Sequence, residues 1–158
     1  MVSPVAATAS IARLAAEHHL DIVPETVSIN ELGLDFQVAF AEASDGQHWV
    51  LRIPRRADVM PRADVEARVL RRIAPHLSVA VPQWRIHTST LIAYPLLPGE
   101  PGLTLQPDGT PEWHFDEHSP VFSHSLGTLL AQLHSIPAET VEGTGITATE
   151  CIDVGTGD

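Results

Sequence analysis

The chain has 158 residues, of which 44% are hydrophobic and 18% charged, so it can bury a core and is too apolar for a disordered chain. Acidic residues outnumber basic ones by 20 to 9, which gives a formal net charge of −11, and every basic residue is an arginine. This balance disfavours a nucleic-acid-binding protein, because phosphate neutralisation needs clustered cations. The length fits one domain, or one domain and the start of another.

Cysteine content and hydropathy bear on the compartment. The single cysteine, Cys151, cannot form an internal disulfide, which favours a reducing environment. No apolar stretch approaches the roughly 20 residues of a membrane helix. Residues 1–10 lack the basic and apolar regions of a signal peptide. We therefore expect a cytoplasmic protein with no membrane partner.

Apolar periodicity divides the first part of the chain into one helix and three strands. Residues 8–19 carry apolar side chains at helical spacing, so a helix is expected there. The pattern then changes to β, with strands expected at 26–32, 35–42 and 47–53. An Asp-Gly pair marks the turn between the last two strands. Short links between consecutive strands predict an antiparallel meander.

The second part of the chain begins with another helical pattern. A helix is expected at 61–77, followed by two strands at 79–86 and 89–94. Residues 96–109 contain three prolines and three glycines, which predicts a loop or hairpin. A last helix is expected at 119–135, because a serine suits its N-cap and a proline its first turn, ahead of a wide apolar stripe.

This order of elements predicts an α+β fold in the arrangement of a kinase small lobe, a five-stranded antiparallel sheet with a flanking helix. The N-terminal lobe is expected at 1–97 and a connector loop or hairpin at 98–118. The incomplete start of a helical C-terminal lobe is expected at 119–158. The apolar stripe of the helix at 119–135 needs a cover, which either a large lobe or self-association would supply.

Two charged residues lie in apolar surroundings. Glu66 is three and four residues before Val69 and Leu70 and shares their helix face, where a carboxylate is costly unless it is paired. Arg52 lies within an apolar strand and shares a face with Val50. Each residue has a simple interpretation, in which its charged group reaches water. The alternative is an ion pair in which Glu66 holds Arg52 against nucleotide phosphates, as strand–helix pairs do in kinases.

Two more segments fit the same interpretation. Residues 30–36 form the turn between the first two strands, where protein kinases place a glycine-rich loop over the phosphates. Gly33 is the only glycine in this turn, and an ordinary hairpin would look the same. Residues 91–97 form an apolar strand that runs into an extended connector, which can present backbone groups to a purine base. The alternative here is an ordinary buried strand.

Together, these segments resemble the macrolide 2′-phosphotransferases. The matching runs include Asn-Glu-Leu-Gly-Leu-Asp, Trp-Val-Leu-Arg-Ile-Pro-Arg-Arg, Glu-Ala-Arg-Val-Leu, Ala-Val-Pro-Gln-Trp-Arg and Ala-Tyr-Pro, which begin at positions 30, 49, 66, 80 and 93. The end of the last helix, residues 129–137, is shared more widely with aminoglycoside kinases. The Arg-Ile-Pro-Arg-Arg run is the most specific, because related kinases usually have lysine in place of Arg52.

The resemblance implies a bilobal kinase-like fold and an activity. The γ-phosphate of GTP or ATP, with Mg²⁺, would be transferred to the 2′-hydroxyl of a macrolide antibiotic and confer resistance, and family members tend to prefer GTP. Arg52 would contact the nucleotide phosphates and Glu66 would orient it. The nucleotide-contacting residues that the resemblance implies are Gly33, Leu34, Asp35, Phe36, Val38, Val50, Arg52, Glu66, Ala93, Tyr94, Pro95 and Leu96.

The sequence departs from the family pattern in the catalytic loop. Family members have a His-Gly-Asp string and, later, a metal-binding aspartate, and no His-Gly-Asp occurs here. We therefore predict no catalytic residue and no metal site in this chain, and no kinase activity for the 158 residues alone. Two alternatives stay open: a kinase of the same fold that acts on an aminoglycoside or another small alcohol, and a non-catalytic module that binds nucleotide or self-associates.

Overall fold

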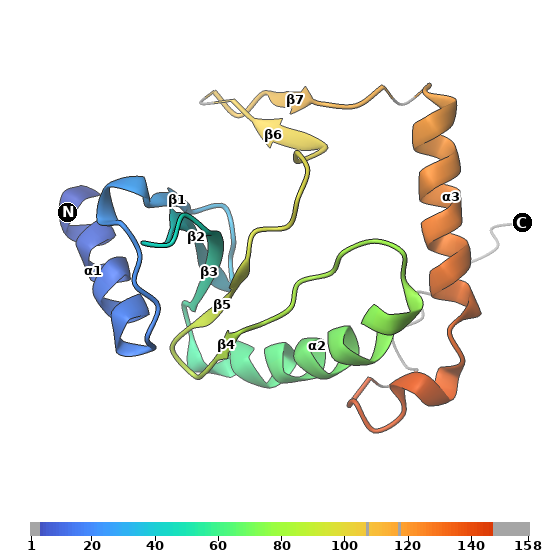
Figure 1. The fold of residues 1–158 in the computed structure, drawn as a ribbon, viewed down its shortest axis with the longest axis horizontal. Coiled ribbons are helices and arrows are strands. Elements are labelled where there is room, and N and C mark those ends of the chain that lie inside the picture. The colour runs from blue at the N-terminus through green and yellow to red at the C-terminus, as the bar shows by residue number, and fades with distance from the viewer. Residues whose placement is uncertain (1–3, 107, 117, 147–158) are drawn as a thin grey trace, which may run out of the picture.

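The fold centres on one antiparallel sheet. A computed structural model describes residues 4–106, 108–116 and 118–146 (Figure 1). The sheet has five strands in the order β1-β2-β3-β5-β4, every neighbouring pair antiparallel. Its strands are β1 (Ser28–Asn30), β2 (Phe36–Glu42), β3 (His48–Pro54), β4 (Ile86–His87) and β5 (Ile92–Pro95). The predicted α+β class, the five-stranded sheet and the β1-β2-β3 meander are confirmed.

One face of the sheet is covered by the first helix, α1 (Pro4–Glu17). Its buried residues Ile11 and Ala15 belong to a hydrophobic core that includes Ala39 of β2, Leu51 of β3 and Ala93 of β5. These three strand residues are paired across the ladders, so they point to the same face. The alternation of each strand therefore sends its other side chains to the opposite face.

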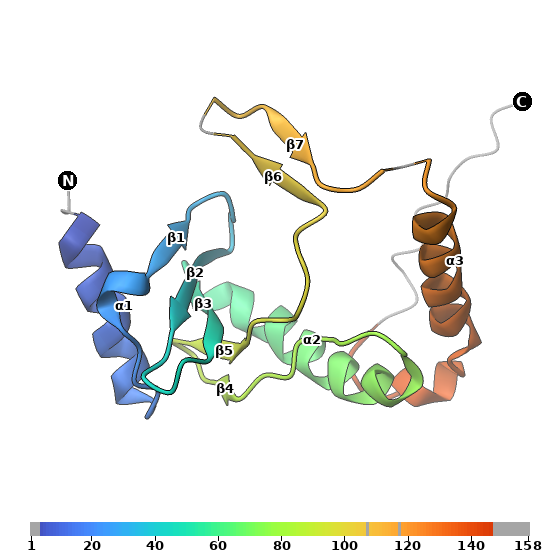
Figure 2. The ribbon, with the colours of Figure 1, turned by 45° about the horizontal axis from the view of Figure 1, so that its top comes forward.

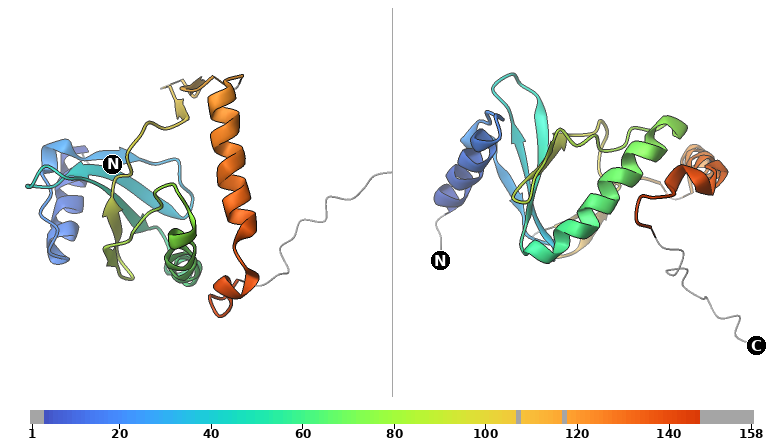
Figure 3. Two further views of the ribbon diagram at one scale, coloured as in Figure 1. Left: turned by 45° about the vertical axis from the view of Figure 1, so that its right-hand side comes forward. Right: turned by 90° about the horizontal axis from the view of Figure 1, so that it is seen from below.

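The helix α2 (Met60–Ile73) lies on that opposite face, so the sheet stands between two helices (Figure 3, right). Pro61 occupies the first turn, where its missing N–H costs nothing. Ala63 and Ala67 are the buried residues of the helix, and their small side chains let the helix lie close to its neighbours. The α-helix ends earlier than expected, because Pro75 diverts the chain into a 3₁₀ turn at Ala74–His76.

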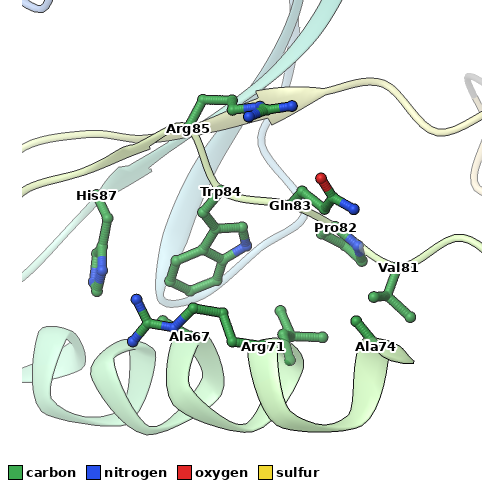
Figure 4. Close-up of a pocket in the computed structure, with 10 residues that line it drawn as sticks. Ala67, Arg71, Ala74, Val81, Pro82, Gln83, Trp84, Arg85 and His87 are labelled. Carbon is green, nitrogen blue, oxygen red and sulfur yellow. The ribbon is translucent and has the colours of Figure 1, made fainter. Parts of the chain in front are cut away.

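The strand predicted at 79–86 is wrong, since only its last residue lies in β4. Residues 79–85 belong to no strand. Pro82 has no backbone N–H to donate to a neighbouring strand, so β4 cannot extend back towards residue 79 as a regular strand. The Trp84 side chain instead lies above α2 (Figure 4). The neighbouring strand β5 is also shorter than predicted, because Thr88 and Leu91 form a turn closed by a backbone bond of 2.9 Å.

A hairpin and a long helix follow the sheet. Strands β6 (Leu103–Leu105) and β7 (Pro111–Trp113) form a separate two-stranded sheet and lead to α3 (Pro120–Ser135). The predicted N-cap is present, because the Ser119 hydroxyl accepts from the backbone N–H of Phe122. The helix α3 stands apart from the five-stranded sheet (Figures 1 and 2), and none of its residues is buried. Among the described helices, none combines the length and apolar character that crossing a membrane would need.

Hydrogen bonds at two places join the last described part of the chain to residues on or just after α2. The Gln132 side chain of α3 exchanges hydrogen bonds with Ser78, just after α2, at 3.0–3.1 Å. Arg68 of α2 is half-buried and donates to the backbone oxygen of the buried Thr144 at 2.8 Å. The remainder of the expected C-terminal tail, with Cys151, lies outside the described residues.

Candidate functional site

Arg52 and Glu66 form the ion pair that the sequence suggested. Arg52 Nη1 donates to Glu66 Oε1 at 2.7 Å, and Nη2 donates to Oε2 at 3.1 Å. The guanidinium and carboxylate therefore meet in the two-pronged geometry that only arginine can offer. The Arg52 side chain is 17% exposed and that of Glu66 is 41% exposed. The pair connects the middle of β3 to α2, and its two side chains are only partly exposed to solvent.

The sheet surface around this pair is apolar. Val38 of β2 and Ile92 of β5 lie directly opposite Arg52 in the two ladders that flank it. One pair further along, Val50 lies opposite Tyr94 on the same face. Val50 and Ile92 are buried, whereas Val38 and Tyr94 are partly open. The ion pair thus borders a strip of branched and aromatic side chains that can cover one face of a flat ring.

Two aromatic rings also approach the Arg52 guanidinium. Its central carbon lies 4.4 Å from the centroid of Phe36 and 5.4 Å from that of Trp84. Both distances are within the range of cation–π attraction. Phe36 was among the predicted site residues. Trp84 was not, because the strand expected at 79–86 gave no reason to place its ring beside Arg52.

The turn before β2 is held in place by two arginines that follow β3. Arg55 Nε donates to the backbone oxygen of Gly33 at 2.9 Å, and its Nη2 forms an ion pair with Glu31. Arg56 forms an ion pair with Asp35 at 2.8 Å. Sequence analysis assigned these two arginines no role, because they break no apolar pattern and reach the turn only through the β2–β3 ladder. They anchor the turn at the end of the sheet where the Arg52 strand finishes.

Gly33 is required in this turn by a close backbone approach. A Cβ atom at this position would lie 2.5 Å from the backbone oxygen of Phe36. That separation is well inside van der Waals contact, so any side chain would force the turn to move. Leu34, next to it, is 85% exposed. The turn is therefore tightly folded and presents its tip to solvent.

The predicted hinge residues divide between the two faces of the sheet. Tyr94 lies on the Arg52 face, and burial raises the pKa of its phenol above the ordinary value, against a smaller lowering by the Arg52 charge. Pro95 is half-buried and Leu96 is 45% exposed, with its backbone N–H bonded to the oxygen of His48 at 2.8 Å. Ala93 stands apart: its side chain is in the α1-facing core and its backbone oxygen accepts from Arg85.

Residues of metal-binding type do not cluster in the part of the chain that the structure describes. Within residues 4–106, 108–116 and 118–146, no three His, Cys, Asp or Glu side chains come together as they would around an ion. A Mg²⁺ ion accompanying a nucleotide would need oxygen ligands. The charged groups that the described part of the chain gathers at this site are guanidinium groups and the carboxylates paired with them.

Comparison with known proteins assigns this geometry to a family. The sequence profile of the phosphotransferase enzyme family matches residues 26–151, which is most of the chain. The chain belongs to the phosphotransferase enzyme family. Membership accounts for the kinase-like fold of the described residues.

Macrolide phosphotransferases are among the relatives within this family. The chain is 57% identical to the apoenzyme of macrolide 2′-phosphotransferase MphH from Brachybacterium faecium, with a TM-score of 0.85 over 88% of this chain and 47% of that one. A macrolide 2′-phosphotransferase type I is 40% identical, with a TM-score of 0.78 over 92% of this chain and 48% of that one. The Bacillus subtilis (strain 168) protein YcbJ, described as uncharacterized, is 41% identical over 86% of this chain and 45% of its own length.

More distant solved structures share the fold alone. The GDP and kanamycin complex of an aminoglycoside 2″-phosphotransferase is 18% identical, with a TM-score of 0.63 over 89% of this chain and 46% of that one. The chain spans about half the length of the relatives it matches. The resemblance to macrolide phosphotransferases seen in the sequence is therefore confirmed at the level of family and fold, for an N-terminal portion.

Proposed function

We propose that this chain is the nucleotide-binding portion of a kinase that phosphorylates the 2′-hydroxyl of macrolide antibiotics with GTP or ATP, and so confers resistance. The observation that carries the proposal is the two-pronged Arg52–Glu66 pair, which sits beside the Gly33 turn and the apolar strip. These three features are what a triphosphate nucleotide needs: a cation for its phosphates, a turn over them, and an apolar surface for its base.

Arg52 retains the capacity to bind phosphate while it is paired. A guanidinium has five N–H donors, and two of them are used by Glu66. Among the described residues, no other group accepts a hydrogen bond from Arg52, so the remaining N–H groups are free for phosphate oxygens. Glu66 then serves to fix the direction of the guanidinium.

The base would lie further along the same face of the sheet. Val38, Val50 and Tyr94 offer apolar contact to a purine ring, and Pro95 and Leu96 continue into the connector. The Ala93 side chain points to the other face, so a contact of Ala93 with the base would be made by its backbone. The remaining predicted contacts, from Gly33 to Phe36, would cover the phosphates.

A macrolide is favoured over an aminoglycoside as the acceptor. The two macrolide phosphotransferases are 57% and 40% identical to this chain, whereas the kanamycin complex of an aminoglycoside enzyme is 18% identical. The acceptor pocket, the catalytic residues and the ligands for Mg²⁺ are expected in the part of such an enzyme that this chain does not match. The 158 residues alone are therefore predicted to be inactive, and turnover of erythromycin by them would contradict this.

A non-catalytic, self-associating module is the second candidate. It is supported by the apolar side chains that α3 exposes, with Val121 at 75%, Leu130 at 44% and Leu126 at 43%. An exposed apolar surface of this kind is typical of a site that packs against another domain or another chain. In an intact kinase the large lobe would cover it, whereas a self-associating chain would use a second copy. Sedimentation of the chain, with and without Leu126→Glu, separates these cases. The cytoplasmic location suggested by the cysteine content stays a prediction.

Calorimetric titration with GTP and with ATP, each with Mg²⁺, tests the nucleotide site. We expect saturable binding that Arg52→Ala weakens at least tenfold, a loss of about 1.4 kcal/mol. The control is Arg13→Ala, an exposed arginine on α1, on the other face of the sheet, which should leave binding unchanged. The ratio of the two affinities reports whether guanine is preferred. If neither nucleotide binds this chain or the protein at its full natural length, the proposal is wrong.

A further inference from the structure

Two aromatic rings lie near the Arg52 guanidinium in addition to its ion-pair partner. Glu66 contacts the guanidinium nitrogens, while the rings of Phe36 and Trp84 approach its central carbon at 4.4 and 5.4 Å. The two rings come from separate elements, the first residue of β2 and the segment before β4. We call Phe36 and Trp84 the aromatic pair. Its members meet at one cation although they are far apart in the sequence.

Trp84 is linked to α2 through His87 of β4. Its ring makes an edge-to-face contact with His87, with centroids 5.0 Å apart and an angle of 77°. His87 Nε2 in turn lies 2.9 Å from Asp64 Oδ1 on α2, two residues before Glu66. The Trp84 ring also lies over Ala67 in the wall of a cavity of about 280 Å³ (Figure 4). Trp84 therefore bridges α2 and the strand that carries Arg52.

A hydrogen bond within the described residues does not account for the position of the Trp84 indole. Its Nε1 atom is buried and has no hydrogen-bond partner among the described residues. A buried donor without a partner is unfavourable, so an indole would normally turn to satisfy it. What the observed position provides is the face of a large ring next to a desolvated cation, where cation–π attraction is strongest.

We propose that Trp84, together with Phe36, is a positioning residue that sets the plane of the Arg52 guanidinium, which makes the site specific for arginine at position 52. This inference rests on the proposed nucleotide site. A guanidinium is flat, so one edge can bind Glu66 while aromatic rings approach its faces and its other N–H groups stay directed at phosphate. A lysine ammonium has no plane to fix and cannot bind a carboxylate in two places.

The test compares Mg²⁺–GTP affinity by calorimetry in the protein at its full natural length. Trp84→Leu removes the aromatic face and should weaken binding about tenfold, whereas Trp84→Phe keeps a ring and should stay within about twofold of wild type. Arg52→Lys should also weaken binding about tenfold. The matched control is Trp113→Leu, since Trp113 is 62% exposed in the β6–β7 hairpin and should leave affinity unchanged.

The deciding measurement is whether the two positions act through each other. In the Arg52→Lys background, Trp84→Leu should cost less than about threefold, because there is no longer a guanidinium to orient. Thermal unfolding of each variant checks the fold. If Trp84→Leu does not fold, Phe36→Leu replaces it, because that ring lies closer to Arg52.

The possible results distinguish a failure of the proposed role of Trp84 from a failure of the proposed nucleotide site. Equal effects of Trp84→Leu in both backgrounds, or equal losses in Trp84→Leu and Trp84→Phe, would mean a merely structural tryptophan and would overturn the inference. So would a Trp84→Leu variant with wild-type affinity. In each case GTP would still bind in an Arg52-dependent manner, so the nucleotide site would stand. A wild-type protein that does not bind GTP would overturn both.

Discussion

Removing the Glu66 carboxylate should destabilise the lobe as well as weaken nucleotide binding. In Glu66→Ala, the Arg52 guanidinium loses its two hydrogen bonds of 2.7 and 3.1 Å and is left with the aromatic pair. Arg52 is 17% exposed, so water can compensate for only part of the loss. The variant should therefore be less stable than one in which both charged groups are removed together.

The exposure of the two side chains sets the size of the effect. Fully exposed pairs contribute about 0.2–1 kcal/mol, and removing one partner of a fully buried pair costs about 3–5 kcal/mol. Glu66 is 41% exposed, so we expect a value between these two ranges and closer to that of the exposed pairs. We expect a coupling free energy of about 1–2 kcal/mol between the two positions, partly screened by salt.

A double-mutant cycle measures this coupling directly. The chain and its Arg52→Ala, Glu66→Ala and doubly substituted variants are unfolded in urea and followed by circular dichroism. The coupling is the amount by which the two single losses exceed the loss in the double variant. A value below about 0.3 kcal/mol, within the error of additive sites, would refute the reasoning. The pair would then be a surface contact of no energetic consequence.

Two further predictions concern the turn and the hinge. Gly33→Ala should destabilise the chain by about 1–3 kcal/mol in urea, since its Cβ would lie 2.5 Å from the Phe36 oxygen. Gly127→Ala in α3, where nothing lies within 4 Å, should stabilise it by up to about 1 kcal/mol, and equal signs would contradict the argument. Tyr94 is the only tyrosine, so alkaline titration followed by tyrosinate absorbance should give a pKa above 10.0 in the folded chain, higher still in Arg52→Ala. Folding raises the pKa of Tyr94, so its neutral phenol contributes to the free energy of unfolding below a pH of about 10. This contribution is lost as the pH rises through the pKa of the folded chain. An ordinary pKa in the folded chain would show that the phenol is not desolvated.

Local patterns were sufficient for the elements whose signals lie within a few residues. The meander follows from the alternation along β2 and β3 and from the Asp-Gly turn between them. The N-cap at Ser119 was also predictable, because a cap depends on its own first helical turn. The segment at 79–86 shows the limit of this reasoning. Its apolar residues favoured a strand, but Pro82 interrupts the ladder and the Trp84 ring lies against His87 of β4 and over α2.

The candidate site was predicted in part for the same reason. Arg52 and Glu66 were found because each breaks a local apolar pattern, and a charge in apolar surroundings requires a partner. The arginines after β3 carry no such signal, because they follow the strand in an exposed, polar stretch. Their bonds to the backbone of Gly33 and to Asp35 exist only because the β2–β3 ladder brings the two ends together.

By itself, the sequence determined the α+β class, the order of helices and strands, and the two charges that form the central ion pair, because periodicity and local polarity encode these properties. Tertiary structure alone decided which side chains gather around the Arg52 guanidinium and that Ala93 faces away from it. Phe36, Trp84 and Glu66 lie up to 48 positions apart in the chain and meet only when the sheet and α2 pack together. Contacts between distant segments depend on that packing, which no short stretch of sequence records.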